Sequence, residues 1–132
     1  MSTPDYKHVT TDAVVSTYIS ASSIFNGLLK EVRELSRKKP EATMSTGKVK
    51  LVNRVLADLL GFLKDEPEGK YLEELDDQTL PQMSDALLVM VQFDTALNRF
   101  KGRYQTYNDM LREHQWITAE FVAAQNQNKK RR

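Results

Sequence analysis

Two stretches of the chain contain residue types that could bind phosphate or calcium. In the fragment MSTGKV a glycine and a lysine stand as in a phosphate-binding loop, but Ala42 replaces the first glycine and Val49 replaces the metal-binding Ser or Thr. A calcium loop that began at Asp65 would have Pro67 and Gly69 at positions that need side-chain oxygens. We therefore interpret the first fragment as the start of a helix and the second as a solvated acidic loop.

Histidines and carboxylates give little support for catalysis. The chain has two histidines and no cysteine. A helix would turn the adjacent side chains of Glu113 and His114 about 100 degrees apart, which does not suit a shared metal ion. Asp58 and Asp94 have no histidine three residues later, the spacing that helical metal sites use. We therefore expect no enzymatic activity, no cofactor, no metal ligands and no small-molecule substrate.

Basic residues beside aromatic ones offer a candidate contact with nucleic acid. In NRFKGRYQTY two arginines lie four residues apart, and such a pattern can bind a phosphate backbone and stack bases. The terminal KKRR would add salt-sensitive affinity without sequence reading. The candidate contacts are Arg99, Lys101, Arg103, Lys129, Lys130, Arg131 and Arg132. We favour the competing interpretation, in which the aromatic residues belong to a helix–helix seam and the arginines form its solvated flank.

Length and composition indicate one small domain. A chain of 132 residues is long enough to bury a core without disulfides or metals. The absence of cysteine fits a reducing, cytoplasmic compartment. Residues 1–20 lack the basic start and apolar run of a signal peptide, and no stretch approaches the roughly 18 apolar residues of a membrane span. We therefore expect a cytoplasmic protein that does not contact a membrane.

The near-neutral net charge of +1 conceals two charged segments. A basic segment, residues 30–54, carries eight Lys or Arg against three Asp or Glu. An acidic segment, residues 65–85, carries eight Asp or Glu and only Lys70 as a base. In an up-and-down bundle these two segments would lie about one helix length apart, and the two ends of the molecule would differ in charge.

Two amphipathic helices are predicted in the first half of the chain. Apolar residues recur at three- and four-residue steps over residues 11–38, where a threonine can cap the first amides and Pro40 prevents continuation. The same spacing predicts a second helix over residues 47–64, after a Ser–Thr cap. The acidic connection, residues 64–81, is predicted to contain a short helix that begins at Pro67.

The third helical pattern is the longest. After a cap at Asp77 or Thr79, two apolar positions repeat every seven residues, which is typical of the seam of a helical bundle. One set is Met83, Met90, Leu97, Tyr104 and Leu111, and the other is Ala86, Phe93, Phe100, Tyr107 and His114. Apolar spacing continues to about Gln125, so the helix either runs unbroken from about Pro81 or breaks near residues 101–105.

These patterns predict an all-α fold. We expect an up-and-down bundle of three long helices, the third unbroken or divided into two, with a short helix in the acidic connection. Residues 1–125 would form a single helical-bundle domain and residues 126–132 a basic polar tail that does not contribute to folding. The expected core residues are Val15, Phe25, Val32, Val52, Leu56, Leu59, Phe93, Leu97 and Phe100.

The predicted function is that of a non-enzymatic protein–protein interaction module, a small subunit or homo-oligomer that acts through its long third helix. The first two helices are too short to cover a seam from Met83 to Phe121, so its aromatic end needs another surface. We favour a second copy of the chain over a fourth helix that folds back. The expected interface residues are Tyr104, Tyr107, Leu111, Trp116 and Phe121. The alternative is a nucleic-acid-binding accessory protein that uses the basic helix flank and the KKRR tail.

Overall fold

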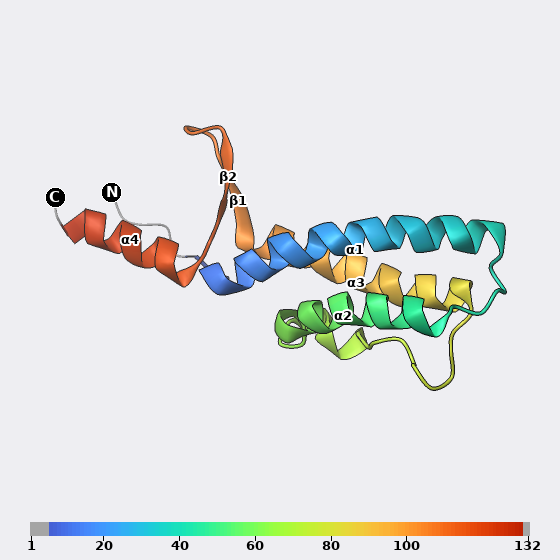
Figure 1. The fold of residues 1–132 in the computed structure, drawn as a ribbon. Coiled ribbons are helices and arrows are strands. Elements are labelled where there is room, and N and C mark those ends of the chain that lie inside the picture. Colours follow the sequence, from blue (N-terminus) through green and yellow to red (C-terminus); the bar gives the residue numbers. More distant parts are fainter. Residues whose placement is uncertain (1–5, 131–132) are drawn as a thin grey trace.

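The computed structural model describes residues 6–130, and this part of the chain is mostly helical (Figure 1). In chain order the elements are α1 (Asp12–Lys38), α2 (Thr46–Leu63), the 3-10 helix η1 (Pro67–Tyr71), α3 (Met83–Tyr104), β1 (Gln105–Asn108), β2 (Glu113–Trp116) and α4 (Ala119–Lys130). The all-α prediction is therefore wrong in one respect, because a two-stranded sheet joins α3 to α4. None of the helices described is both long enough and apolar enough to cross a bilayer.

Local signals set the ends of α1 and α2. Thr11 Oγ1 accepts a hydrogen bond from the amide of Val14 at 3.2 Å, and Ser45 Oγ accepts one from the amide of Lys48 at 3.2 Å. A side chain therefore caps each helix start, as the sequence predicts. α1 ends two residues before Pro40, whose ring cannot continue a helix.

The start of α3 differs from the prediction. The helix begins at Met83, and no side chain caps it. Instead, the amide of Met83 donates to the carbonyl oxygen of Ala42 at 2.9 Å, so the loop after α1 satisfies an amide that a cap would otherwise serve. Neither Asp77 nor Thr79 is the cap, and the amide of Thr79 is itself bound by Asp76 Oδ1 at 3.0 Å in a turn before the helix.

The helices α2 and α3 run parallel to each other, and both run antiparallel to α1 (Figure 1). The connection from α2 to α3 crosses back along α2. Asn53 holds its middle, because the side chain donates to the carbonyl oxygen of Leu75 at 2.9 Å and accepts from the amide of Leu75 at 2.8 Å. At its end, the amide of Met44 donates to the carbonyl oxygen of Pro81 at 2.8 Å. The predicted up-and-down order is therefore wrong, and so is the predicted separation of charge, because the acidic segment ends beside the basic segment.

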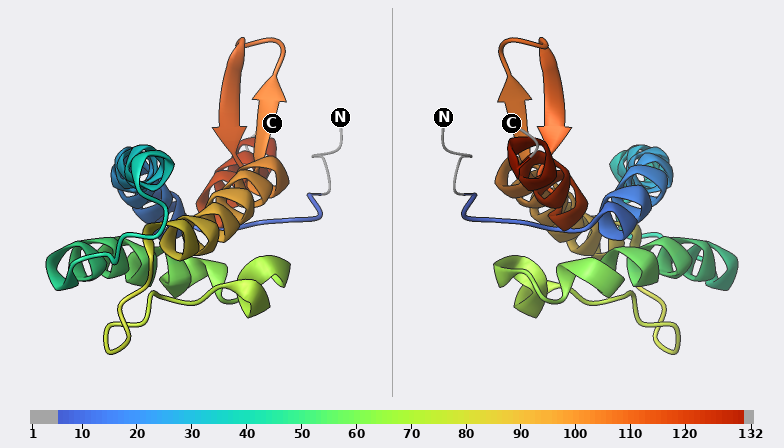
Figure 2. Two further views of the ribbon diagram at one scale, coloured as in Figure 1. Left: turned by 90° about the vertical axis from the view of Figure 1, so that its right-hand side faces the viewer. Right: turned by 90° about the vertical axis from the view of Figure 1, so that its left-hand side faces the viewer.

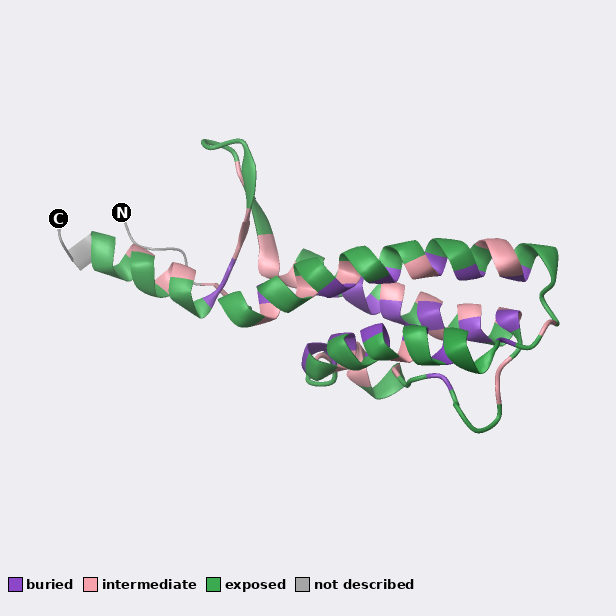
Figure 3. Ribbon diagram, in the orientation of Figure 1, coloured by how far each residue is buried: buried purple, intermediate pink, exposed green. Residues whose placement is uncertain are grey.

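One hydrophobic core lies between α1, α2 and α3. Figure 3 shows the buried faces of these helices turned toward one another. Eight of the nine predicted core residues belong to it: Phe25, Val32, Val52, Leu56, Leu59, Phe93, Leu97 and Phe100. Val15 is also buried, at 8% exposure, but it lies outside this core. The loop residues Met44 and Leu75, which the periodicity of the helices does not reveal, complete the core.

The third helix stops at Tyr104, within the predicted break, so the unbroken helix is excluded. An antiparallel β-hairpin follows in place of another helical turn. Tyr107 favours a strand, and Asn108 favours a turn, because its Oδ1 accepts hydrogen bonds from the amides of Met110 and Leu111 at 3.0 and 3.1 Å. These local preferences outweigh the seven-residue pattern beyond Tyr104.

The hairpin returns the chain to the start of α1, where α4 begins. The amide of Thr10 donates to the carbonyl oxygen of Ile117 at 3.0 Å, and the carbonyl oxygen of Thr10 accepts from the amide of Ala119 at 2.8 Å. Glu120 Oε2 accepts from the amide of Asp12 at 2.9 Å, which lowers the pKa of Glu120.

Helix α4 then extends away from the three packed helices (Figure 1). None of its described side chains belongs to the core, so the alternative of a fourth helix that folds back onto the bundle is wrong. The helix also continues across the predicted start of the basic tail, up to Lys130. The chain therefore has a packed body, formed by α1, α2 and α3, and a hairpin and a helix that project from it.

Two glycines in different surroundings should respond oppositely to alanine. A Cβ atom at Gly27, within α1, would meet nothing within 4 Å, so Gly27→Ala should raise the free energy of unfolding. The gain is about 1 kcal/mol, the difference in helix propensity. A Cβ atom at Gly69 would lie 2.5 Å from the carbonyl oxygen of Lys64, so Gly69→Ala should destabilise the protein. Urea unfolding of both variants measures the contrast, and changes of the same sign would contradict it.

Candidate interaction site

Aromatic rings fill the junction between the hairpin and the helices. The ring of Tyr18 in α1 lies 5.0 Å from that of Trp116 in β2 and 5.5 Å from that of Phe100 in α3. Tyr104 lies 4.7 Å from Phe100. Both Tyr104 and Trp116 are partly buried against the core. The chain itself therefore covers two of the five residues that the sequence assigned to an interface.

Tyr107 and Leu111 remain open to solvent, at 53% and 60% exposure. Tyr107 pairs with His114 across the hairpin, and their rings lie 5.1 Å apart. The seven-residue spacing of Tyr107 and His114 suggested one helix face, but the two side chains are cross-strand neighbours. Both predicted interface residues therefore lie on the hairpin and not on a helix.

The hairpin tip carries the most exposed of the large apolar side chains described. Met110 is 94% exposed, in the loop between Asn108 and Glu113. Arg112 in the same loop has a φ of 55°, in the left-handed region that closes tight turns. Sequence reasoning placed Met110 on a helix and missed it as a site residue. The Asn–Asp pair before it, between two strand-forming segments, is the signal that could have identified the turn.

Phe121, the last of the predicted interface residues, is partly buried on α4. Its ring lies 6.2 Å from that of Tyr6 in an edge-on arrangement, and its amide donates to Thr118 Oγ1 at 3.0 Å, which caps α4. Phe121 therefore lies on the helix that begins at the base of the hairpin. The structure does not bring it together with the hairpin tip (Figure 1).

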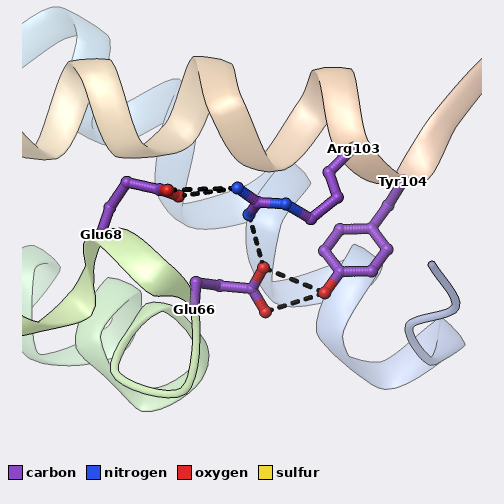
Figure 4. Close-up of polar contacts among 4 residues, drawn as sticks. All are labelled: Glu66, Glu68, Arg103 and Tyr104. Atoms are coloured by element: carbon purple, nitrogen blue, oxygen red, sulfur yellow. Dashed lines mark hydrogen bonds and ion pairs between the residues drawn. The ribbon is translucent and has the colours of Figure 1, made fainter. Parts of the chain in front are cut away.

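A cluster of four polar side chains joins the end of α3 to η1 (Figure 4). Arg103 donates through Nη1 to Glu66 Oε1 at 2.7 Å and through Nη2 to Glu68 Oε2 at 3.1 Å. The Tyr104 hydroxyl donates to the Glu66 carboxylate at 2.9 Å. The three charged side chains are 12–23% exposed, so water screens their attraction less than at an open surface. Arg103 and Tyr104 thus bind the two carboxylates, and this charged joint links η1 to the end of α3.

The basic residues assigned to nucleic acid do not form the expected pair. Arg99 and Lys101 are exposed on α3, whereas the guanidinium of Arg103 is held by two carboxylates. The interaction with those carboxylates also raises the pKa of Arg103. Within the part of the chain that the structure describes, the two arginines four residues apart therefore offer one free charge and not two. The remaining candidates are Lys129 and Lys130, at the end of α4, and Arg131 and Arg132, which lie outside the described residues.

Burial, followed by the hydrogen bond to Glu66, raises the pKa of Tyr104 to about 12. A tyrosine in the unfolded chain ionises near pH 10, so the folded state favours the neutral phenol. The resulting stability is fully present below about pH 10 and is lost as the pH rises from about 10 to about 12. Burial also raises the pKa of Tyr18, so absorbance titration of phenolate should show late-ionising tyrosines whose number falls by one in Tyr104→Phe. If the wild type and Tyr104→Phe show the same late phase of ionisation, this assignment to Tyr104 is wrong.

No protein-family model matches this chain, and comparisons with curated proteins and with solved structures find no significant similarity.

Proposed function

We propose that the protein is a non-enzymatic interaction module that binds a second copy of itself through its β-hairpin. In this proposal α1, α2 and α3 form a small bundle that supports the hairpin, and Tyr107, Met110 and Leu111 form the contact surface. The observation that carries the proposal is the 94% exposure of Met110 at the tip of a hairpin that stands off the helices in both views of Figure 2.

Physical arguments favour a partner on this hairpin. Three large apolar side chains within five residues are more than half exposed, and apolar groups gathered in this way mark interaction surfaces. An isolated two-stranded hairpin is marginally stable in water, and this one packs on the helices at its base, through Trp116. Because the sheet consists of β1 and β2 alone among residues 6–130, each strand also has an outer edge with unpaired backbone groups in that part of the chain. Contact with a partner would stabilise the hairpin and cover its tip.

The test is the mass of the protein in solution after Tyr107→Glu and Leu111→Glu are combined. The wild type should form a dimer at micromolar concentration, and the double variant should be a folded monomer, because burying two carboxylates in the contact is costly. Light scattering measures the mass, and circular dichroism checks the fold. Leu88→Glu is the matched control, since Leu88 is 62% exposed on α3 and roughly 24 Å along the helix from the hairpin.

Each outcome of this test is informative. A dimer that survives the double variant would exclude the hairpin as the interface. A wild type that stays monomeric at high micromolar concentration would exclude self-association altogether. A control variant that dissociates as fully as the double variant would place the contact on α3.

A further inference from the structure

A groove lies between α1 and α2, on the outside of the packed body. It has a volume of about 560 Å³, within the range of clefts that bind ligands and side chains. Its lining includes Ser16, Ser20, Ile24, Leu51, Arg54 and Asp58. A second hollow of about 370 Å³ shares Thr17 and Asp58 with the groove and continues it toward the end of α2. The small residues of α1 leave this space open.

The groove presents two apolar and two charged side chains to solvent. Ile24 is 57% exposed and Leu51 is 47% exposed. Arg54 and Asp58 are exposed on the same side of α2, since both line the groove. Neither takes part in an ion pair among the residues that the structure describes. Both apolar side chains and both charges are therefore available to a partner.

The hairpin tip has the complementary composition. It consists of Asp109, Met110, Leu111 and Arg112, which are two apolar side chains between an acid and a base. All four are exposed, and neither charge is in an ion pair within the described chain. The tip therefore complements the groove. Each has two exposed apolar side chains, and Asp109 and Arg112 of the tip are opposite in charge to Arg54 and Asp58 of the groove.

We propose that the hairpin tip of one copy docks into the α1–α2 groove of a second copy. Met110 and Leu111 pack against Ile24 and Leu51, while Asp109 and Arg112 face the groove charges of opposite sign. A chain cannot fill its own groove in this way, because its hairpin projects away from α1 and α2 (Figures 1 and 2). Each copy has one tip and one groove, so two reciprocal contacts related by a two-fold axis close a dimer.

This inference rests on the proposed self-association, and it names the surface that receives the hairpin. Because the chain has no cysteine, single cysteines can report the contact without interference. Full-length Met110→Cys is mixed with full-length Leu51→Cys, one of them carrying a size tag, under mild oxidation. A disulfide forms readily only where the two Cα atoms approach to about 4.4–6.8 Å. The mixed, disulfide-linked species should be the main product on a non-reducing gel.

The matched control pairs Met110→Cys with Leu88→Cys. Leu88 is exposed like Leu51, but it lies on α3 and not on α2. It should give several-fold less of the mixed species. Equal yields from the two pairs would overturn docking in the groove. Docking in the groove would also be wrong if the wild type is a dimer by light scattering but the Met110→Cys and Leu51→Cys variants give no mixed disulfide. In that case the proposed self-association through the hairpin would still stand. A monomeric wild type would exclude both the self-association and the docking in the groove.

A charge exchange provides a second measurement that does not depend on cysteine. Arg54→Glu should raise the dimer dissociation constant at least several-fold, because it places like charges opposite Asp109. Adding Asp109→Arg should restore dimerisation, since it reverses the pair. If the double variant dissociates further than the single variant, the two residues do not meet and the proposed docking is wrong.

Discussion

Replacing Leu97 by alanine is expected to lower the free energy of unfolding by about 2–5 kcal/mol. Leu97 is 3% exposed and belongs to the core between α1, α2 and α3. The shortened side chain loses its transfer free energy and leaves a cavity that close-packed neighbours fill only in part. Urea unfolding at equilibrium measures the loss.

The matched control for this change is Leu88→Ala. Leu88 lies on the same helix, but it is 62% exposed, so its truncation should change stability by no more than about 0.5 kcal/mol. A cost below about 1 kcal/mol at Leu97 would contradict its place in the core. Equal costs at the two positions would contradict the orientation of α3.

Arg103→Met is expected to destabilise the protein by about 2–3 kcal/mol, somewhat less than the 3–5 kcal/mol typical when a fully buried ion pair loses one partner. The methionine keeps an apolar stem but leaves Glu66 and Glu68 without their shared cation. The two carboxylates are 12% and 23% exposed, so water compensates them only in part.

Arg99→Met is the control for this second prediction. Arg99 lies one helical turn before Arg103 and is exposed, and the same chemical change there should be nearly neutral. Thermal or urea unfolding distinguishes the two variants. If Arg103→Met is as stable as Arg99→Met, the cluster that Figure 4 shows does not hold η1 to α3.

The sequence predicts those parts of the fold that depend on neighbouring residues. The cap at Thr11, the stop before Pro40 and the 3-10 helix that begins at Pro67 are each determined within a few positions. The buried faces of α1, α2 and α3 follow from apolar spacing in the same way. Local rules therefore recover most helix boundaries and most of the core.

Contacts between distant segments are not predictable in this way. The parallel course of α2 and α3 depends on Asn53, which binds both backbone groups of Leu75. No pattern within either segment indicates that pairing. The start of α3 depends likewise on Ala42, 41 positions earlier, whose carbonyl oxygen takes the place of a cap.

The candidate site shows what local sequence patterns predict and what they do not. The sequence assigns Tyr107 and Leu111 to an interface because the first two helices are too short to cover a third helix of that length, but both residues lie on a hairpin and not on a helix. The seven-residue period gave equal weight to residues before and after Tyr104, although Asn108 and Asp109 favour a turn. The partnership of Arg103 with Glu66, at a separation of 37 residues, has no local signal.

The hydrogen bonds that join Thr10 to Ile117 and Ala119 connect points near opposite ends of the described chain. Closing so long a loop has a high entropic cost, which these two backbone bonds, the bond from the Asp12 amide to Glu120 and the burial of Ile117 offset at the junction. We therefore expect this junction to form last during folding and to open first in native fluctuations. When it opens, we expect α4 to move away from α1, while the core and the base of the hairpin, where Trp116 packs against Tyr18 and Phe100, stay in place.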